Sequence, residues 1–216
     1  MKKVVGFGGA AESGKTTAAN MLVDIAQPTR HFHIEFSDPI MEIGKSLTDG
    51  SVADESDLVD KFYTELQSLQ PDMPLQRIDG LRLPDAYASN LFNRKFGALS
   101  AETKQQHRPI LEWIGRSAIQ SVSPQIWGDI VYTNVLQEQE AGSDLITIGG
   151  VRTVADNQVV QNLHGYTVRV LRGDDAVARL DTEHELNSWN ADFTVRNDRS
   201  LDGLRNSVRD IWSKIV

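Results

Sequence analysis

The segment Gly9–Thr17 constrains the fold more than any other part of the chain. It reads G-A-A-E-S-G-K-T-T and fits the pattern G-x-x-x-x-G-K-[ST], with Gly9, Gly14, Lys15 and Thr16 at the defining positions. Glycines there allow backbone conformations that residues with a Cβ resist, so successive N–H groups can turn inward around phosphate oxygens. A helix that begins at the same point directs its positive dipole end at the anion. The segment therefore predicts a phosphate-binding loop between a strand and a helix.

Apolar residues on both sides supply the context that this motif needs. Lys3–Gly8 is a short apolar run, typical of a buried parallel strand, and apolar residues recur at helical spacing after the motif until Pro28. In this order, the lysine reaches the β- and γ-phosphates of ATP, and the hydroxyl after it binds Mg²⁺. A chance Gly-rich turn would not require these flanks. The predicted ATP-binding residues, with Thr16 also the metal ligand, are Gly9, Ala11, Ser13, Gly14, Lys15, Thr16 and Thr17.

The composition excludes several classes of protein. The chain has 216 residues, 40% of them hydrophobic and 24% charged, as in an ordinary folded domain. Its net charge of −8 disfavours a general binder of nucleic acid polymers or membrane surfaces. The lack of cysteine excludes disulfides and thiolate metal sites. Because the first strand follows Met1 without a signal-peptide region, and no stretch could span a bilayer, we expect a cytoplasmic protein, in the host cytoplasm if the source is a virus.

Strands alternate with helices along much of the chain. Besides the first strand, apolar runs or alternating patterns predict strands at 31–36, 145–148, 166–171 and 193–195. This alternation predicts an α/β fold, in which a five-stranded parallel sheet has helices on both faces. We therefore predict a three-layer α/β fold in which the phosphate-binding loop, or P-loop, follows a central strand.

The middle of the chain departs from this alternation. Apolar side chains at helical spacing predict helices near 58–69, 85–96 and 110–122. Ser123 and Pro124, a capping residue and a residue of fixed φ, predict the start of a further helix. We therefore predict one domain, residues 1–216, with a core of about 1–48 and 140–216 and a helical insertion of about 49–139.

A polar segment follows the second predicted strand. Ser37 or Asp38 can cap the next helix, with Pro39 at its first position. If the first two strands are neighbours, Asp38 also lies beside the phosphate-binding loop, at the sheet edge where ligands collect. Capping and ligand contact can coexist, so both interpretations stay open.

Two pairs of arginines are candidates for phosphate contacts. Arg108 and Arg116 lie on the same predicted helix as Glu112, where a solvated charge is the commoner role. Arg172 and Arg179 flank a small polar segment after the fourth strand. Since Arg binds phosphate bidentately and stabilises transition-state charge, we interpret this segment as a mobile lid rather than a solvated connection.

Several separate stretches, taken in order, resemble one known family. They are the P-loop, F-S-D-P, R-P-I-L-E-W-I-G-R, G-G-V-R, the Arg-containing lid, E-H-E-L-N and N-D-R-S-L-D-G-L. This order resembles the phage-type deoxynucleoside monophosphate kinases, over most of the chain apart from the insertion. The resemblance implies ATP- and Mg²⁺-dependent phosphorylation of a (deoxy)nucleoside monophosphate to its diphosphate. It also implies a helical region that binds the monophosphate and a lid of about 172–188.

The resemblance implies roles for individual residues. Asp38 orients the acceptor or a metal-bound water, and His184 orients a group rather than removing a proton, because an acceptor phosphate is already ionised. The catalytic residues that it implies are Lys15, Asp38, Arg172 and Arg179. The residues that it implies for the acceptor are Phe36, Asp38, Arg108, Glu112, Arg116, Arg152, Glu183, His184 and Glu185.

The chain departs from the family's pattern after the third strand. Gly150 stands where relatives usually have an acidic residue, which leaves Asp38 as the better candidate for a carboxylate near the metal. Thr153–Asp156 reads T-V-A-D where relatives tend to read F-P-N-E. The alternatives are another small-molecule P-loop kinase such as a dephospho-coenzyme A kinase, a switch protein that hydrolyses ATP slowly, and a degenerate kinase that only binds nucleotide. The preferred base and a homodimeric state are left open.

Overall fold

The chain divides into two compact units. The computed structural model describes residues 3–10, 12–172, 189–197 and 200–216. The first unit, here called the sheet unit, comprises residues 1–36 and 131–216. The second, here called the helical unit, comprises residues 37–130. In the described part of the chain, no helix combines the length and the apolar character needed to cross a membrane.

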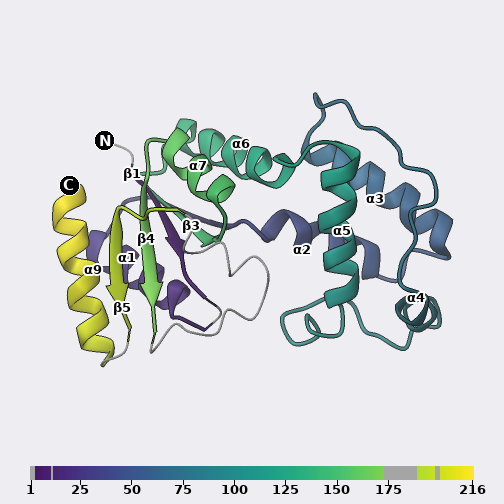
Figure 1. Ribbon diagram of the computed structural model, residues 1–216, viewed down its shortest axis with the longest axis horizontal. Coiled ribbons are helices and arrows are strands. Elements are labelled where there is room, and N and C mark those ends of the chain that lie inside the picture. The colour runs from purple at the N-terminus through teal and green to yellow at the C-terminus, as the bar shows by residue number, and fades with distance from the viewer. Residues whose placement is uncertain (1–2, 11, 173–188, 198–199) are drawn as a thin grey trace. The chain divides into compact units, whose positions relative to one another are not determined.

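A five-stranded parallel sheet forms the centre of the sheet unit (Figure 1). Its strands are β1 (Lys3–Gly8), β2 (His31–Glu35), β3 (Leu145–Val151), β4 (Tyr166–Leu171) and β5 (Phe193–Arg196). Their order is β2-β3-β1-β4-β5, and each neighbouring pair runs parallel. The predicted fold class is therefore confirmed, and the strand before the P-loop is the central one.

The sheet order corrects one expectation. The first two strands are not neighbours, so the condition under which Asp38 would lie beside the P-loop is not met. Instead β3 pairs with both, so that Glu35 at the end of β2 lies opposite Gly149 of β3 in the register. Asp38 itself is the first residue of the helical unit's first helix.

Helices cover both faces of the sheet (Figure 1). Among the described residues, the helices that pack on the sheet are α1 (Lys15–Ala26), α6 (Ile126–Glu140, whose residues 126–130 belong to the helical unit), α7 (Val154–Asn162) and α9 (Leu201–Ile215). Alternate residues of a strand point to opposite faces. Val5 and Phe7 of β1 accordingly pack in a cluster with α1 and α9, whereas Val4 packs in a second cluster with α6 and α7. The result is the three-layer arrangement that the sequence predicts.

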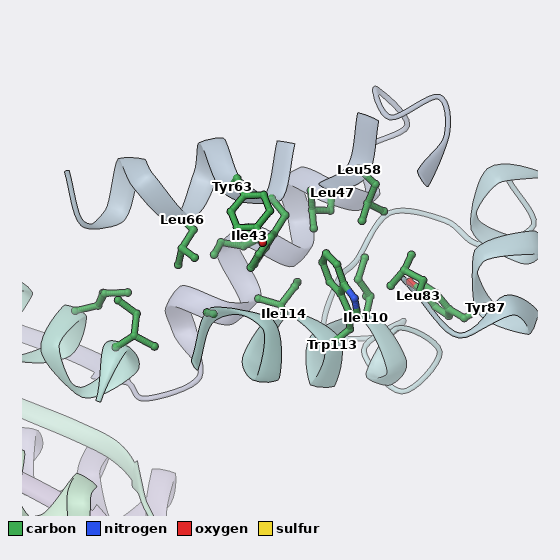
Figure 2. Close-up of a cluster of buried hydrophobic side chains, with 14 residues drawn as sticks. Ile43, Leu47, Leu58, Tyr63, Leu66, Leu83, Tyr87, Ile110, Trp113 and Ile114 are labelled. Atoms are coloured by element: carbon green, nitrogen blue, oxygen red, sulfur yellow. The ribbon is translucent and has the colours of Figure 1, made fainter. Parts of the chain in front are cut away.

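The helical unit is built around an apolar cluster. Its helices are α2 (Asp38–Thr48), α3 (Glu55–Leu69), α4 (Asp85–Phe92) and α5 (Arg108–Ser121). Figure 2 shows side chains of α2, α3 and α5, among them Ile43, Tyr63 and Trp113, gathered between these helices. Phe62 is fully buried, and its ring meets the Trp113 ring edge-on at 4.9 Å between centroids. The predicted helical stripe of α3 therefore supplies core residues.

Two boundaries differ from those expected. The helical unit begins at Ser37 rather than near residue 49, because Ile43 and Leu47 of α2 pack in its apolar cluster. Helix α6 begins at Ile126 rather than at Ser123 and Pro124. The Ser123 carbonyl accepts a hydrogen bond from the Ile126 N–H, which makes a turn before the helix instead of its first residues.

Candidate functional site

The loop after β1 requires glycine at two positions. Gly9 has a φ of 145°, and a Cβ there would lie 2.3 Å from the Val170 carbonyl oxygen and 2.7 Å from the Ser13 Oγ. Gly14 has a φ of 98°, and a Cβ there would lie 2.3 Å from the Asn197 Nδ2. Residues with a Cβ avoid such φ values, and no heavy atoms pack this closely. The two glycines of the motif are therefore fixed by the backbone of the loop and its neighbours.

The polar groups of the loop are arranged around its backbone. The Lys15 Nζ donates hydrogen bonds to the carbonyl oxygens of Gly9, at 2.9 Å, and Ala10, at 2.6 Å. Ser13 is 2% exposed, and its Oγ has no hydrogen-bond partner among the described residues. Leaving a buried hydroxyl unpaired costs about 1–3 kcal/mol. An anion or a water at the loop would remove this cost, so the loop fits a ligand with phosphate oxygens.

Residues that follow β4 and β5 form hydrogen bonds with the backbone of the loop. The Asn197 Nδ2 donates to the Ser13 carbonyl oxygen at 2.9 Å, and the Asn197 N–H donates to the Leu171 carbonyl oxygen at 2.6 Å. The Arg172 Nη1 donates to the Glu12 carbonyl oxygen at 3.1 Å. Asn197 begins the N-D-R-S-L-D-G-L stretch of the resemblance, but sequence reasoning assigned it no role at the loop.

A cavity of about 570 Å³ lies at this loop. Its lining residues are Glu12, Gly14, Lys15, Thr16, Thr17, Arg172, Asn197 and Leu201. The volume is in the range of sites that take small molecules. The lining combines the N-terminus of α1, two cationic side chains and Leu201, an apolar residue that is 66% exposed. Such a lining suits an anion that carries an apolar group.

The segment after β3 has a structural explanation for its unusual sequence. The Asp156 Oδ2 accepts hydrogen bonds from the N–H groups of Arg152, at 2.9 Å, and Thr153, at 3.0 Å. The Thr153 Oγ1 accepts from the Asp156 N–H, which completes a capping box at the start of α7. Burial raises the pKa of Asp156, while these hydrogen bonds and the Arg152 charge act in the opposite direction. The T-V-A-D stretch therefore caps a helix.

Trp189 and Arg169 join three strand ends, and sequence reasoning missed both. Trp189 is 4% exposed, and its Nε1 donates to the Arg152 carbonyl oxygen at 3.2 Å. The Arg169 guanidinium of β4 lies 4.6 Å from the centroid of the Trp189 ring, and burial lowers the Arg169 pKa. A Cβ on Gly8 of β1 would lie 2.9 Å from the same ring. An aromatic residue within a polar stretch was the only available signal.

The predicted acceptor residues of the helical unit lie mostly on one helix. Arg108, Glu112 and Arg116 follow each other at four-residue spacing on the exposed face of α5. The Arg108 Nε lies 2.9 Å from the Glu112 Oε1, and the Arg116 Nε donates to the Glu112 carbonyl oxygen at 3.4 Å. Asp38 begins α2, and its predecessor Ser37 makes no side-chain capping bond. The three α5 residues therefore form one accessible charged stripe, here called the α5 stripe.

The remaining predicted residues divide into two groups. Phe36 is 8% exposed and packs in the cluster that contains Ile34 and Val151, so it is a core residue of the sheet unit. A contact between Phe36 and a ligand stays a prediction. The predicted residues that lie outside the described part are Ala11, Arg179, Glu183, His184 and Glu185.

The loop also fits the metal that accompanies nucleotides. Thr16 lines the cavity next to Lys15, and a hydroxyl is an oxygen donor of the type that Mg²⁺ takes. Among the described residues, no group of three or more His, Cys, Asp or Glu side chains converges to hold a metal ion. Mg²⁺ at nucleotide sites commonly keeps several waters and takes the remaining ligands from phosphates and one or two protein oxygens.

Comparisons with known proteins do not identify a family for this chain. No known protein family matches the chain, and a search of curated proteins finds no match. Among solved structures, shikimate kinase from Acinetobacter baumannii in complex with shikimate aligns with 100% of this chain and 91% of its own, at 12% identity and a TM-score of 0.36. A likeness of this size carries no argument about reaction or substrate. The fold class rests instead on the sheet order and the P-loop.

Proposed function

We propose that the chain is an ATP-dependent kinase that transfers the γ-phosphoryl group to the phosphate of a (deoxy)nucleoside monophosphate. The cavity of about 570 Å³ at the P-loop is the observation that carries the proposal. It joins a phosphate-binding loop at a helix N-terminus to two cationic side chains and an exposed apolar residue. This combination matches the triphosphate and the base of ATP.

The P-loop holds the phosphates of the nucleotide in this proposal. Its amides and the Lys15 ammonium surround the β- and γ-phosphates, and the buried Ser13 Oγ gains a partner. The first turn of α1 contains no acidic residue, so no carboxylate there opposes the anion. Leu201 and Asn197 line the same cavity, and in this proposal they contact the nucleoside part of ATP.

Residues at the P-loop would hold Mg²⁺ and neutralise charge during transfer. Thr16 is the residue that would hold Mg²⁺, which when bound neutralises charge on the transferred phosphoryl group. Arg172 lies in the cavity lining, where its bond to the Glu12 carbonyl positions the guanidinium. Phosphoryl transfer demands little covalent chemistry of the protein, and its barrier falls through positioning and charge stabilisation. Lys15 and Arg172 supply these two effects, with Arg179 expected to assist.

The α5 stripe is the proposed binding site of the acceptor. Arg108 and Arg116 provide two guanidinium groups, which suit the phosphate of a monophosphate, and Glu112 between them can accept hydrogen bonds from hydroxyl or amino groups. The resemblance to deoxynucleoside monophosphate kinases supports this choice. Asp38 is proposed to orient the acceptor.

The test is an assay with ATP, Mg²⁺ and each common deoxy- and ribonucleoside monophosphate, with ADP and the diphosphate product separated by chromatography. Formation of diphosphate that depends on an acceptor is expected. Lys15→Ala should lower kcat by roughly 10²–10³-fold, as loss of a transition-state contact does, with unchanged circular dichroism. Lys214→Ala, at an exposed lysine of α9, is the matched control and should leave kcat unchanged. Full turnover in Lys15→Ala would contradict the proposal.

The same assay separates the alternatives. ATP loss without any acceptor would indicate a switch protein that hydrolyses ATP. ATP loss only with a coenzyme A precursor would indicate a dephospho-coenzyme A kinase. Nucleotide binding without any turnover would indicate a degenerate kinase.

A further inference from the structure

The end of β3 lacks a side chain that phosphoryl-transfer enzymes of this type use. In P-loop proteins the nucleotide's Mg²⁺ is held by the hydroxyl of the loop and by a carboxylate at the end of a nearby strand. β3 is the neighbour of β1, and it ends in Gly149, Gly150 and Val151. No residue of β3 therefore offers a carboxylate.

The carboxylate of Glu35, at the end of β2, lies close to Gly149 and Gly150. A Cβ on Gly149 would lie 2.1 Å from the Glu35 Oε1, and a Cβ on Gly150 would lie 3.0 Å from the Glu35 Oε2. Glu35 is the last residue of β2, which pairs with the other edge of β3. Its side chain therefore lies across the carboxyl end of β3, in space that a Cβ at position 149 would occupy.

A chain of contacts along β2 orients this carboxylate. The His33 Nε2 lies 3.6 Å from the Glu35 Oε1. The His33 Nδ1 and the His31 Nε2 lie 2.8 Å and 2.9 Å from the Thr147 Oγ1 of β3, which is fully buried. Residues 31, 33 and 35 share one face of β2, since strand side chains alternate. Burial and the neighbouring His33 lower the pKa of His31.

A simple surface ion pair does not explain the arrangement. The side chains of His33 and Glu35 are 36% and 29% exposed, and such pairs contribute about 0–1 kcal/mol. An ion pair between two residues of the same strand can form without a glycine on the neighbouring strand. Gly150 is explained by its own φ of 73°, whereas Gly149 leaves the space that the Glu35 carboxylate occupies at the sheet edge.

We infer that Glu35 is a positioning residue for the Mg²⁺–nucleotide complex, supplying from β2 the carboxylate that β3 lacks. Glu35 then serves the metal together with Thr16, and Asp38 is left to the acceptor. One carboxylate and one hydroxyl, with phosphate oxygens and waters, make a usual Mg²⁺ environment. This inference rests on the proposed function, because it presumes that the P-loop binds a nucleotide.

The test is the Mg²⁺ dependence of ADP binding, measured by calorimetry in excess Mg²⁺ and in EDTA. Glu35→Gln should reduce the gain in affinity from Mg²⁺ by at least about tenfold, the size typical of losing a group that supports a metal, with the Kd in EDTA unchanged. Gly149→Ala should act in the same direction, because its Cβ displaces the intact carboxylate. Glu140→Gln, at an exposed glutamate of α6, is the control and should match the native protein.

The outcomes are distinguishable. A native-like Mg²⁺ effect in Glu35→Gln would overturn the inference and leave the proposed function standing. Loss of the Mg²⁺ effect in Asp38→Asn, with Glu35→Gln unaffected, would assign the role to Asp38 instead. No binding of ADP to the native protein under either condition would remove the proposed function itself, and the inference with it.

Discussion

The two units present their candidate ligand groups in contrasting ways. In the sheet unit, the P-loop depends on backbone geometry, with glycines at positive φ and carbonyls bonded to Lys15, Arg172 and Asn197. In the helical unit, the α5 stripe consists of exposed side chains on a helix whose opposite face is buried. The P-loop is defined by its backbone conformation, whereas the α5 stripe is defined by charged side chains on the exposed face of a helix.

This difference determines what each site tolerates. A change at the P-loop alters the conformation of the loop and therefore both binding and stability. A change in the α5 stripe leaves the apolar cluster beneath it intact, so the charge of this surface can change without loss of the fold. The following predictions test this contrast, in order of decreasing effect on the free energy of unfolding.

Phe62→Ala tests whether the helical unit depends on its apolar cluster alone. Phe62 is fully buried against Trp113, and removing a buried aromatic ring costs about 3–5 kcal/mol. We expect a loss of this size in urea unfolding, with ADP affinity of the folded protein unchanged. Ile119→Ala, at a residue of α5 that is 40% exposed, is the control and should cost far less. A loss of ADP affinity in folded Phe62→Ala would break the contrast between the units.

Gly9→Ala tests the dependence of the P-loop on its backbone. A Cβ at a φ of 145°, within 2.3 Å of a carbonyl oxygen, should destabilise the protein by about 1–3 kcal/mol and abolish ADP binding. Gly97→Ala is the control, since a Cβ at that position meets no atom within 4 Å. Calorimetry and urea unfolding give the two readouts. Native ADP affinity in Gly9→Ala would show that the loop adapts, and that its glycine is not needed.

Local patterns predicted much of the fold. Leu58, Phe62 and Leu66 recur at helical spacing, and all three are buried in the helical cluster. The P-loop motif predicted both the strand before it and the helix after it, because its chemistry requires that order. Each of these signals lies within a stretch of about ten to fifteen residues, where periodicity and turn chemistry act directly.

Contacts between distant segments could not be predicted in this way. Asn197 bonds to Ser13, and Glu35 lies on Gly149, only because of the strand order β2-β3-β1-β4-β5. The residue pattern of a single strand does not predict the order of the strands in the sheet. The absence of a carboxylate at the end of β3 is visible in the sequence, but the position of the Glu35 side chain beside Gly149 depends on the pairing of β2 with β3.

Tyr87→Phe tests whether a buried polar pair also contributes to the helical unit. The Tyr87 hydroxyl lies 2.5 Å from the Nδ1 of His107, which is fully buried and whose Nε2 lies 2.8 Å from the Gly97 carbonyl oxygen. Burial raises the pKa of Tyr87, so the hydroxyl stays protonated and donates. Its removal leaves the Nδ1 unpaired and should cost about 1–3 kcal/mol in urea unfolding. Tyr132→Phe in the sheet unit is the control, and an equal loss there would show a general effect of removing a hydroxyl.

Asp49→Asn tests the smallest contribution, a surface charge between α2 and α3. Hydrogen bonds from Ser51, and then the Lys61 ammonium at 3.1 Å, lower the pKa of Asp49 from 3.8 to about 2. Because the folded pKa lies below the unfolded one, the charge stabilises the fold above about pH 4, and the effect is lost as the pH falls through about 2. The side chain is 49% exposed, so we expect less than about 1 kcal/mol at neutral pH.

The measurement is the difference in Tm between the native protein and Asp49→Asn, followed from pH 7 to pH 2. We expect a small positive difference that is constant above about pH 4 and vanishes near pH 2, and that shrinks in high salt because exposed charges are screened. A difference that persists at pH 2 would arise from hydrogen-bond geometry instead of charge. The helical unit would then depend on directional polar contacts as the P-loop does, and the contrast between the two units would be one of degree.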